Sequence, residues 1–164
     1  MTLLVPCYIW PREFGVIKHS MFVSVEPKLE PIDHSDCTIL LVEDNESLAN
    51  AMSGLLRLYG FKVLQARNAA EAFQISACFE GIIHFLLIDA VLPQVSGIDL
   101  AGLLVTQRPE VQLIFMSGYT EEELCRNGLL APGFTFIQKP ASIQTIVSHI
   151  KARMSFQAAL VTRH

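Results

Sequence analysis

The sequence predicts a doubly wound α/β fold, in which helices cover both faces of a five-stranded parallel sheet. Short apolar runs, as expected of strands buried on both faces, alternate with segments whose apolar residues recur at helical spacing. This alternation repeats five times between residues 37 and 154. Strands that strictly alternate with helices form a parallel sheet with helices on both faces.

Length and composition agree with one domain and an appendage. The chain has 164 residues, of which 12 are Lys or Arg and 16 are Asp or Glu, for a formal net charge of −4. Apolar residues make up 51% and charged residues 17%, so the chain can bury a core. The mean hydropathy of +0.40 is high, but the longest apolar run, residues 82–88, contains His84. It is much shorter than the roughly 20 residues of a membrane span, so no span is expected.

Charges, cysteines and the first residues exclude other classes of protein. An acidic chain without a Lys/Arg cluster is not expected to bind nucleic acid directly. No cationic residue precedes Arg12, and Pro6 and Pro11 interrupt the first apolar stretch, so we expect no secretory signal and a cytoplasmic protein. The four cysteines lack the spacing of zinc or redox motifs and are too few for a disulfide scaffold; they are Cys7, Cys37, Cys78 and Cys125.

Two terminal segments lie outside this pattern. Residues 1–36 hold four of the eight prolines and show no sustained periodicity, so we expect an irregular or disordered extension. Met21 is an alternative start site within it. Residues 155–164 are expected to form a C-terminal tail, too short for a DNA-binding output domain.

The first two strand–helix units lie between residues 38 and 79. Residues 38–42 form a continuous apolar run, which predicts a buried strand. A helix follows and ends at Gly60, a typical C-terminal glycine; its apolar positions are Leu48, Met52, Leu55, Leu56 and Tyr59. Residues 61–66 predict the second strand. Asn68 and Glu71 have the spacing of a capping box that begins a helix to about Phe79.

Three further units complete the domain. Residues 85–88 predict a strand that ends abruptly at Asp89, and a loop with Pro93 and Gly97 leads to the next helix. The apolar side of that helix carries Ile98, Ala101, Leu104 and Val105. Residues 111–116 and 134–137 predict the fourth and fifth strands, with a short helix at about 120–127 between them. The last helix carries Ile143, Ile146, Val147 and Ile150.

Chemically active side chains gather where the predicted strands end. They are Glu43 and Asp44 after the first strand, Asp89 after the third, Ser117 after the fourth and Lys139 after the fifth. A single Asp after a strand is usually a turn or cap residue, but open α/β sheets place their functional site at this edge. Clustered carboxylates repel one another unless a cation compensates. Oxygen ligands of this kind favour Mg²⁺.

These motifs resemble those of the receiver domains of two-component response regulators. The resemblance covers residues 37–153, about seven-tenths of the chain, and the motifs occur in the family's order and at its spacings. They are TILLVEDNESL from Thr38, FLLIDAVLPQVSG from Phe85, LIFMSGY from Leu113 and FIQKP from Phe136. Receivers associated with hybrid sensor kinases are the most similar. The resemblance implies a flavodoxin-like sheet with strand order 2-1-3-4-5.

The resemblance also implies the chemistry of the site. Asp89 would be the phosphoacceptor. It would hold Mg²⁺ together with Glu43, Asp44 and the backbone carbonyl of Val91. A Mg²⁺ ion and an ammonium group screen the charges when a carboxylate attacks a phosphoryl group.

The resemblance also implies which residues bind the phosphoryl group and which change conformation in response. Ser117 and Lys139 would contact phosphoryl oxygens, and Lys139–Pro140 would be a cis peptide. Phe136 takes the place of the aromatic switch residue. Movement of the Ser117 hydroxyl toward the phosphoryl group would make space for the Phe136 ring. The added charge would in this way change the side-chain packing.

The implied function is signalling rather than enzymatic turnover. A histidine kinase or a histidine phosphotransfer protein would donate the phosphoryl group, and a downstream protein target would bind the surface of the fourth helix, fifth strand and fifth helix. Phosphorylation-dependent homodimerisation stays open. Val91 and Tyr119 flank the position of an attacking water, are bulky and provide no good base, so self-dephosphorylation should be slow.

Two other functional classes remain as alternatives. A degenerate receiver that binds partners without phosphorylation would be expected to lack Asp89, Lys139 or the acidic pair, and all are present. A flavodoxin-like cofactor binder or hydrolase would be expected to carry a glycine-rich loop, a P-loop or a nucleophile elbow, and none occurs. His84 is interpreted as a partly buried histidine rather than a phosphorelay residue. The run Glu121–Glu123 is interpreted as a solvated helix start.

Overall fold

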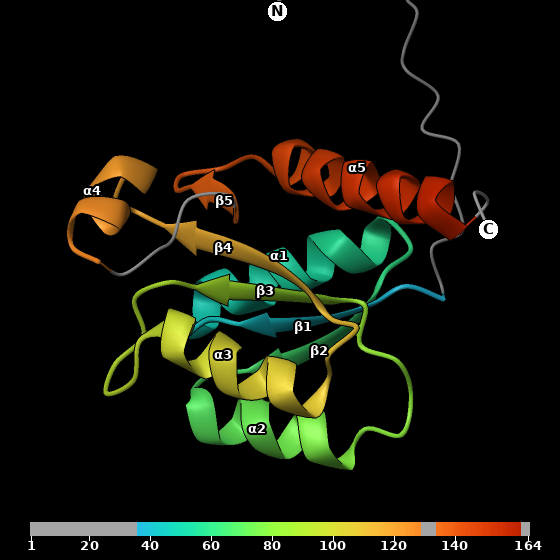
Figure 1. Ribbon diagram of the computed structural model, residues 1–164, viewed down its shortest axis with the longest axis horizontal. Helices are drawn as coiled ribbons and strands as arrows, with labels where there is room; N and C mark the ends of the chain where they lie inside the picture. The colour runs from blue at the N-terminus through green and yellow to red at the C-terminus, as the bar shows by residue number, and fades with distance from the viewer. Residues whose placement is uncertain (1–35, 129–133, 162–164) are drawn as a thin grey trace, which may run out of the picture. The chain divides into compact units, whose positions relative to one another are not determined.

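Five parallel strands form one sheet in the predicted order, β2-β1-β3-β4-β5. The structure is a computed structural model that describes residues 36–128 and 134–161, and Figure 1 shows the sheet with its helices. The strands are β1 (Thr38–Val42), β2 (Lys62–Ala66), β3 (Phe85–Asp89), β4 (Gln112–Ser117) and β5 (Thr135–Gln138). The predicted extension lies outside the described residues, apart from Asp36.

The helices alternate with the strands as the sequence predicts. They are α1 (Glu46–Leu58), α2 (Ala69–Cys78), α3 (Gly97–Gln107), α4 (Glu121–Arg126) and α5 (Ile143–Val161). The last helix continues beyond residue 154, so the predicted C-terminal tail begins within α5. No helix among the described residues is both long enough and apolar enough to cross a membrane.

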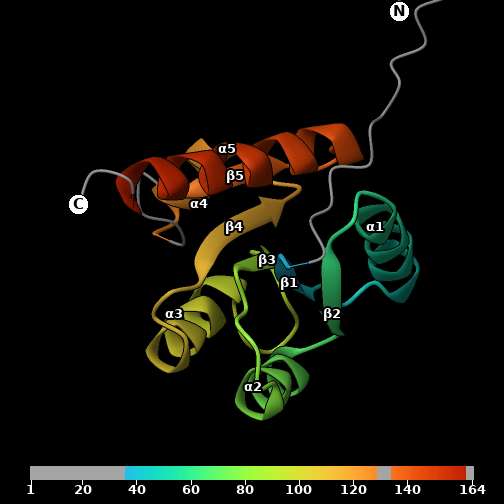
Figure 2. The same cartoon turned by 90° about the vertical axis from the view of Figure 1, so that its right-hand side faces the viewer.

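Two layers of helices bury the two faces of the sheet. In β1, Ile39 and Leu41 pack in one core cluster with residues of α1 and α5, whereas Leu40 and Val42 pack in a second cluster with residues of α2, α3 and α4. Side chains alternate between faces along a strand, so a strand with an uninterrupted apolar run contributes to both clusters. Figure 2 shows α5 and the pair α2 and α3 on opposite sides of the sheet.

Several strand boundaries lie one residue later than predicted, because backbone hydrogen bonds of the preceding turns persist. Phe61 N donates to Leu56 O at 3.2 Å, so β2 begins only at Lys62. Val111 N donates to Arg108 O at 3.0 Å, which delays β4 to Gln112. On the predicted apolar side of α3, Ala101 and Leu104 are buried and Ile98 packs half-buried against the core, while Val105 is only half-buried. Leu100, which was not predicted, is also buried.

Side-chain caps begin the helices at both predicted and unpredicted positions. Asn68 accepts from Glu71 N at 2.9 Å as predicted, but the Glu71 carboxylate accepts from Arg67 N at 2.9 Å rather than from Asn68 N. The complete capping box is at Thr120 and Glu123, at the start of α4. The Thr120 backbone N–H and hydroxyl donate to the Glu123 carboxylate, and these hydrogen bonds lower the pKa of Glu123. The glutamate run is therefore partly structural.

Candidate phosphoacceptor site

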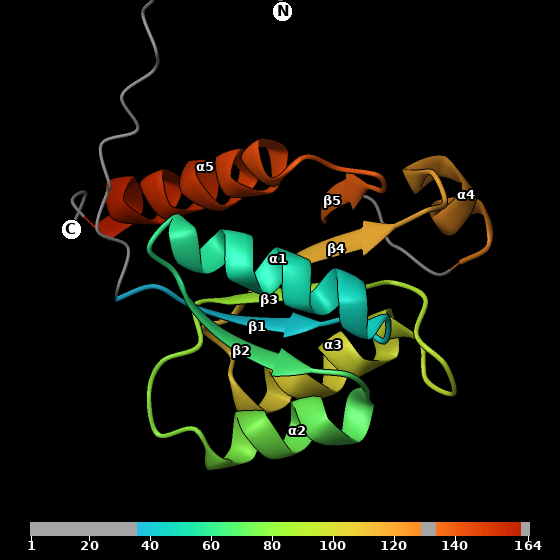
Figure 3. The ribbon, with the colours of Figure 1, turned by 180° about the vertical axis from the view of Figure 1, so that it is seen from behind.

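The strand order brings the predicted site residues to one edge of the sheet. β1 and β3 are neighbours, so Glu43 and Asp44, which follow β1, lie beside Asp89 at the end of β3. Ser117 ends β4 and Lys139 follows β5, and Lys139 N donates to Ser117 O at 2.7 Å. Figure 3 shows β1, β3 and β4 pointing toward the same edge.

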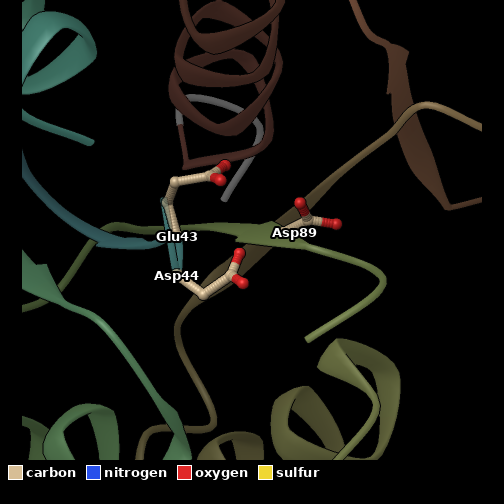
Figure 4. Close-up of side chains that lie close together, drawn as sticks. All are labelled: Glu43, Asp44 and Asp89. Atoms are coloured by element: carbon tan, nitrogen blue, oxygen red, sulfur yellow. The ribbon is translucent and has the colours of Figure 1, made fainter. Parts of the chain in front are cut away.

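The three carboxylates converge as the sequence predicts. One oxygen from each of Glu43, Asp44 and Asp89 lies within 4.8 Å of the other two, close enough to share a cation. Figure 4 shows the three side chains grouped at the ends of β1 and β3. Glu43 is buried, Asp89 is half-buried and Asp44 is exposed. The cluster therefore opens to solvent on the Asp44 side, and hard oxygen ligands of this kind suit a small divalent cation such as Mg²⁺.

Lys139 is the cation that balances this cluster within the protein. Its Nζ lies 2.5 Å from Glu43 Oε2 and 2.6 Å from Asp89 Oδ2. Burial disfavours the charged ammonium, but hydrogen bonds to Asp89 and Glu43 and the charges of these carboxylates outweigh this effect and raise the pKa of Lys139. Lys139 is therefore a fully charged group in contact with the predicted acceptor. The Lys139–Pro140 peptide is cis, as the resemblance implied.

The second oxygen of Asp89 is held by the backbone. Val91 N donates to Asp89 Oδ1 at 2.8 Å, while Lys139 takes Oδ2. The resemblance pointed to the Val91 carbonyl as a metal ligand and not to this amide, since a residue's letter does not reveal which backbone group faces a carboxylate. Both oxygens of Asp89 are thus oriented before any ligand arrives.

A close backbone approach shapes the loop after Asp89. A Cβ atom added to Gly97 would lie 1.9 Å from the Asp89 carbonyl oxygen, and Gly97 N donates to Ala90 O at 3.0 Å. Only glycine fits at this distance. The start of α3 is therefore packed directly against the backbone of Asp89.

The two predicted switch residues lie on neighbouring strands. The Ser117 hydroxyl is buried and accepts a hydrogen bond from Tyr119 N at 3.2 Å. Phe136 is half-buried against the core cluster that α2, α3 and α4 share. Tyr119 and Val91, the two residues predicted to flank the site, are both largely exposed.

His84 lies at the other end of β3, as predicted. Its Nδ1 accepts from Thr38 N at 3.1 Å, and its backbone N–H donates to Thr38 O at 2.9 Å. Its side chain therefore terminates the sheet and takes no part in the acidic cluster.

Comparison with known proteins agrees with this geometry. The response regulator receiver domain model matches residues 39–151. The sensor kinase CckA of Brucella abortus is 30% identical over 120 residues, which are 73% of this chain and 13% of that protein. The chain spans between 13% and 50% of the length of the first three curated relatives it matches.

Solved structures show the same fold. The receiver domain of a hybrid histidine kinase CckA is 28% identical with a TM-score of 0.55, covering 70% of this chain and 96% of that one. A CheY-like receiver domain protein from Methanospirillum hungatei is 24% identical with a TM-score of 0.65, covering 75% and 97% of the two chains. The chain therefore belongs to the response regulator receiver domain family, the phosphoacceptor modules of two-component signal transduction.

Proposed function

We propose that Asp89 is the phosphoacceptor, and that it takes its phosphoryl group from a histidine kinase or a histidine phosphotransfer protein. The observation that carries this proposal is the contact of Lys139 Nζ with Asp89 Oδ2 at 2.6 Å, beside two further carboxylates. A lysine and three carboxylates at the carboxyl edge of a parallel sheet match what phosphoryl transfer to a carboxylate requires.

In the proposed reaction an Asp89 carboxylate oxygen attacks the phosphorus of a phosphohistidine. The P–N bond breaks, the imidazole nitrogen leaves with the electron pair, and an acyl phosphate forms on Asp89. Lys139 exchanges its contact with Asp89 Oδ2 for one with a phosphoryl oxygen, and the backbone amide of Val91 holds Asp89 in place. Positioning and charge stabilisation are the protein's main contributions.

The acidic cluster provides ligands for Mg²⁺. Glu43, Asp44, Asp89 and the carbonyl of Val91 would hold it, and the bound ion would neutralise charge on the transferring phosphoryl group. Lys139 already neutralises part of the cluster, through Glu43 Oε2 and Asp89 Oδ2. The exposed carboxylate of Asp44 is the ligand most accessible from solvent.

Phosphorylation would change a protein-binding surface through Ser117 and Phe136. The phosphoryl group adds about −1.5 to −2 charges and three acceptor oxygens. The Ser117 hydroxyl, which accepts from Tyr119 N, would move toward the phosphoryl group and donate its O–H to one of these oxygens. The half-buried Phe136 ring on the neighbouring strand would then repack. We propose that a downstream protein reads this change on α4, β5 and α5.

Intact-mass analysis after incubation with acetyl phosphate and Mg²⁺ tests the proposal. The wild type should gain one phosphoryl group, Asp89→Asn should gain none, and Asp99→Asn, a matched change on the exposed side of α3, should behave as the wild type. Chelation of Mg²⁺ should abolish the adduct. Without an adduct from acetyl phosphate or from a panel of phosphorylated histidine kinases, the chain would act as a phosphorylation-independent interaction module.

A further inference from the structure

The two edge strands of the sheet, β2 and β5, differ in how their outer backbone groups are used. Along β2, side chains of α1 reach over the outer edge. Arg57 Nη2 donates to Val63 O at 3.0 Å, and Gln65 Nε2 donates to Asn50 Oδ1 at 3.2 Å. Because α1 occupies the outer groups of β2, this edge is protected from pairing with a further strand.

The outer edge of β5 has no such cover among the described residues. Lys139 N donates to Ser117 O at 2.7 Å, and alternate residues of a strand in a parallel sheet turn their backbone groups to the same side. Phe136 and Gln138 therefore direct their N–H and C=O groups away from β4. No group within residues 36–128 and 134–161 hydrogen-bonds to these four groups. Figure 1 shows β5 at one end of the sheet, next to α4 and α5. Such an edge is a template for an added strand.

A cavity of about 440 Å³ adjoins this edge, between β5 and α4. We call it the α4–β5 cavity; its described lining is Thr120, Glu121, Glu122, Cys125 and Gln138. Gln138 is exposed and belongs both to the open edge and to the cavity. An extended chain paired with β5 would turn every second side chain toward the α4 side of the sheet. The cavity is therefore placed to receive one of these side chains.

The charge of the α4–β5 cavity selects the kind of side chain. Glu121 and Glu122 are exposed, and neither forms a salt bridge within the part of the chain that the structure describes. Glu123 serves the capping box, and the one cation of α4, Arg126, lies in its last turn. The two lining carboxylates therefore favour a cationic group. A Lys or Arg side chain has a long apolar stem that could lie in the cavity while its charge meets the glutamates.

We propose that an extended segment of the downstream target pairs with β5 as a further strand and places a Lys or Arg side chain in the α4–β5 cavity. This inference rests on the proposed function, because it names the chemistry of the partner that would bind α4, β5 and α5. A second copy of this chain fits less well, since β5 (Thr135–Gln138) has no cationic residue to offer the cavity. Phe136 lies within β5, so repacking of its ring would change the surface that the added strand contacts.

Fluorescence anisotropy with synthetic peptides tests the pairing. The probes are fluorescein-labelled octapeptides of alternating Thr and Val, with one Lys at each position in turn. At least one should bind with a Kd of about 10–500 µM, and the same peptide with Glu in place of Lys should bind about tenfold more weakly or worse. N-methylation of the alternate amides that face β5 should abolish binding. N-methylation of the other alternate set should be tolerated, because those amides face solvent.

A charge reversal tests the cavity. Glu122→Lys should weaken binding of the Lys peptide by about tenfold or more through like-charge repulsion. Glu110→Lys is the matched control, because Glu110 is exposed in the turn before β4 and the change in charge is the same. It should leave the affinity unchanged. Circular dichroism checks that each variant is folded.

The binding measurements contain no phosphodonor, and Mg²⁺ is chelated, so they do not depend on phosphoryl transfer to Asp89. Absence of the phosphoryl adduct would overturn the phosphoacceptor role and leave the strand pairing intact. Three results would each overturn the strand pairing alone: no binding by any peptide of the panel, equal tolerance of both N-methylated sets, or equal losses from Glu122→Lys and Glu110→Lys.

Discussion

The two ends of β3 use their polar groups in opposite ways. At the amino end, the His84 ring accepts from Thr38 N, and its backbone joins the neighbouring strands. At the carboxyl end, Asp89 lies with Glu43, Asp44 and Lys139 in a cluster where carboxylates outnumber cations. At the amino end, hydrogen bonds within the protein satisfy these polar groups. The carboxyl end keeps unneutralised charge, which marks it as the place where a ligand completes the structure.

The largest effect is expected from one methyl group added beside the carboxyl end of β3. Gly97→Ala places a Cβ atom 1.9 Å from the Asp89 carbonyl oxygen, so the backbone must shift. We expect a loss of more than about 3 kcal/mol of unfolding free energy, measured by urea denaturation. Gly102→Ala, in the same helix but with open space around its Cβ position, should instead gain about 0.5–1 kcal/mol. Equal effects of the two substitutions would contradict the close approach.

Removal of Lys139 tests the charge balance of the cluster. Lys139→Met leaves the buried Glu43 carboxylate without its cation, which should cost about 3 kcal/mol in Mg²⁺-free buffer. Because the pKa of Lys139 is raised in the folded protein, its contribution is complete below the ordinary lysine pKa of about 10.4. It is lost as the pH rises through the raised value.

Urea denaturation across a pH series measures this dependence. The difference in unfolding free energy between the wild type and Lys139→Met should stay constant near neutrality and shrink at strongly alkaline pH. A difference that grows with alkaline pH would show that the lysine stabilises the fold in some other way.

His84→Ala tests whether the polar groups at the amino end of β3 serve only to stabilise the fold. It leaves the buried Thr38 N–H without its acceptor, so the unfolding free energy should fall by about 1–3 kcal/mol. Phosphorylation of Asp89 by acetyl phosphate should be unchanged. His149→Ala on α5 is the matched control and should stay within about 0.5 kcal/mol of the wild type. Loss of the phosphoryl adduct in His84→Ala would mean that the two ends of β3 are coupled.

The smallest effect concerns the lifetime of the phosphorylated state. Val91 is 46% exposed and Tyr119 54% exposed beside the site, and neither side chain provides a good base for water. The wild-type adduct should therefore persist for minutes or longer, and Val91→Asn, which can orient a water, should hydrolyse about tenfold faster. Loss of the intact-mass adduct with time measures both rates, and a wild-type lifetime of seconds would refute this interpretation.

The sequence predicted the fold and the convergence of Glu43, Asp44, Asp89 and Lys139, because both follow from local patterns. Apolar runs such as residues 38–42 mark buried strands, and polar residues at strand ends must meet at one edge of a parallel sheet. The individual contacts between side-chain atoms could not be predicted. Lys139 meets Glu43 across 96 positions and Arg108 reaches Ser76 across 32, and such contacts depend on side-chain conformations that sequence spacing does not determine.

Identification of the residue that carries the phosphoryl group tests directly whether Asp89 is the acceptor. Borohydride reduces an acyl phosphate to an alcohol, so an acceptor aspartate becomes homoserine, which peptide mass analysis locates. After incubation with a phosphorylated histidine kinase and Mg²⁺, we expect homoserine at position 89 alone. Homoserine at position 44, or no reduced residue in a chain that has gained a phosphoryl group, would contradict it.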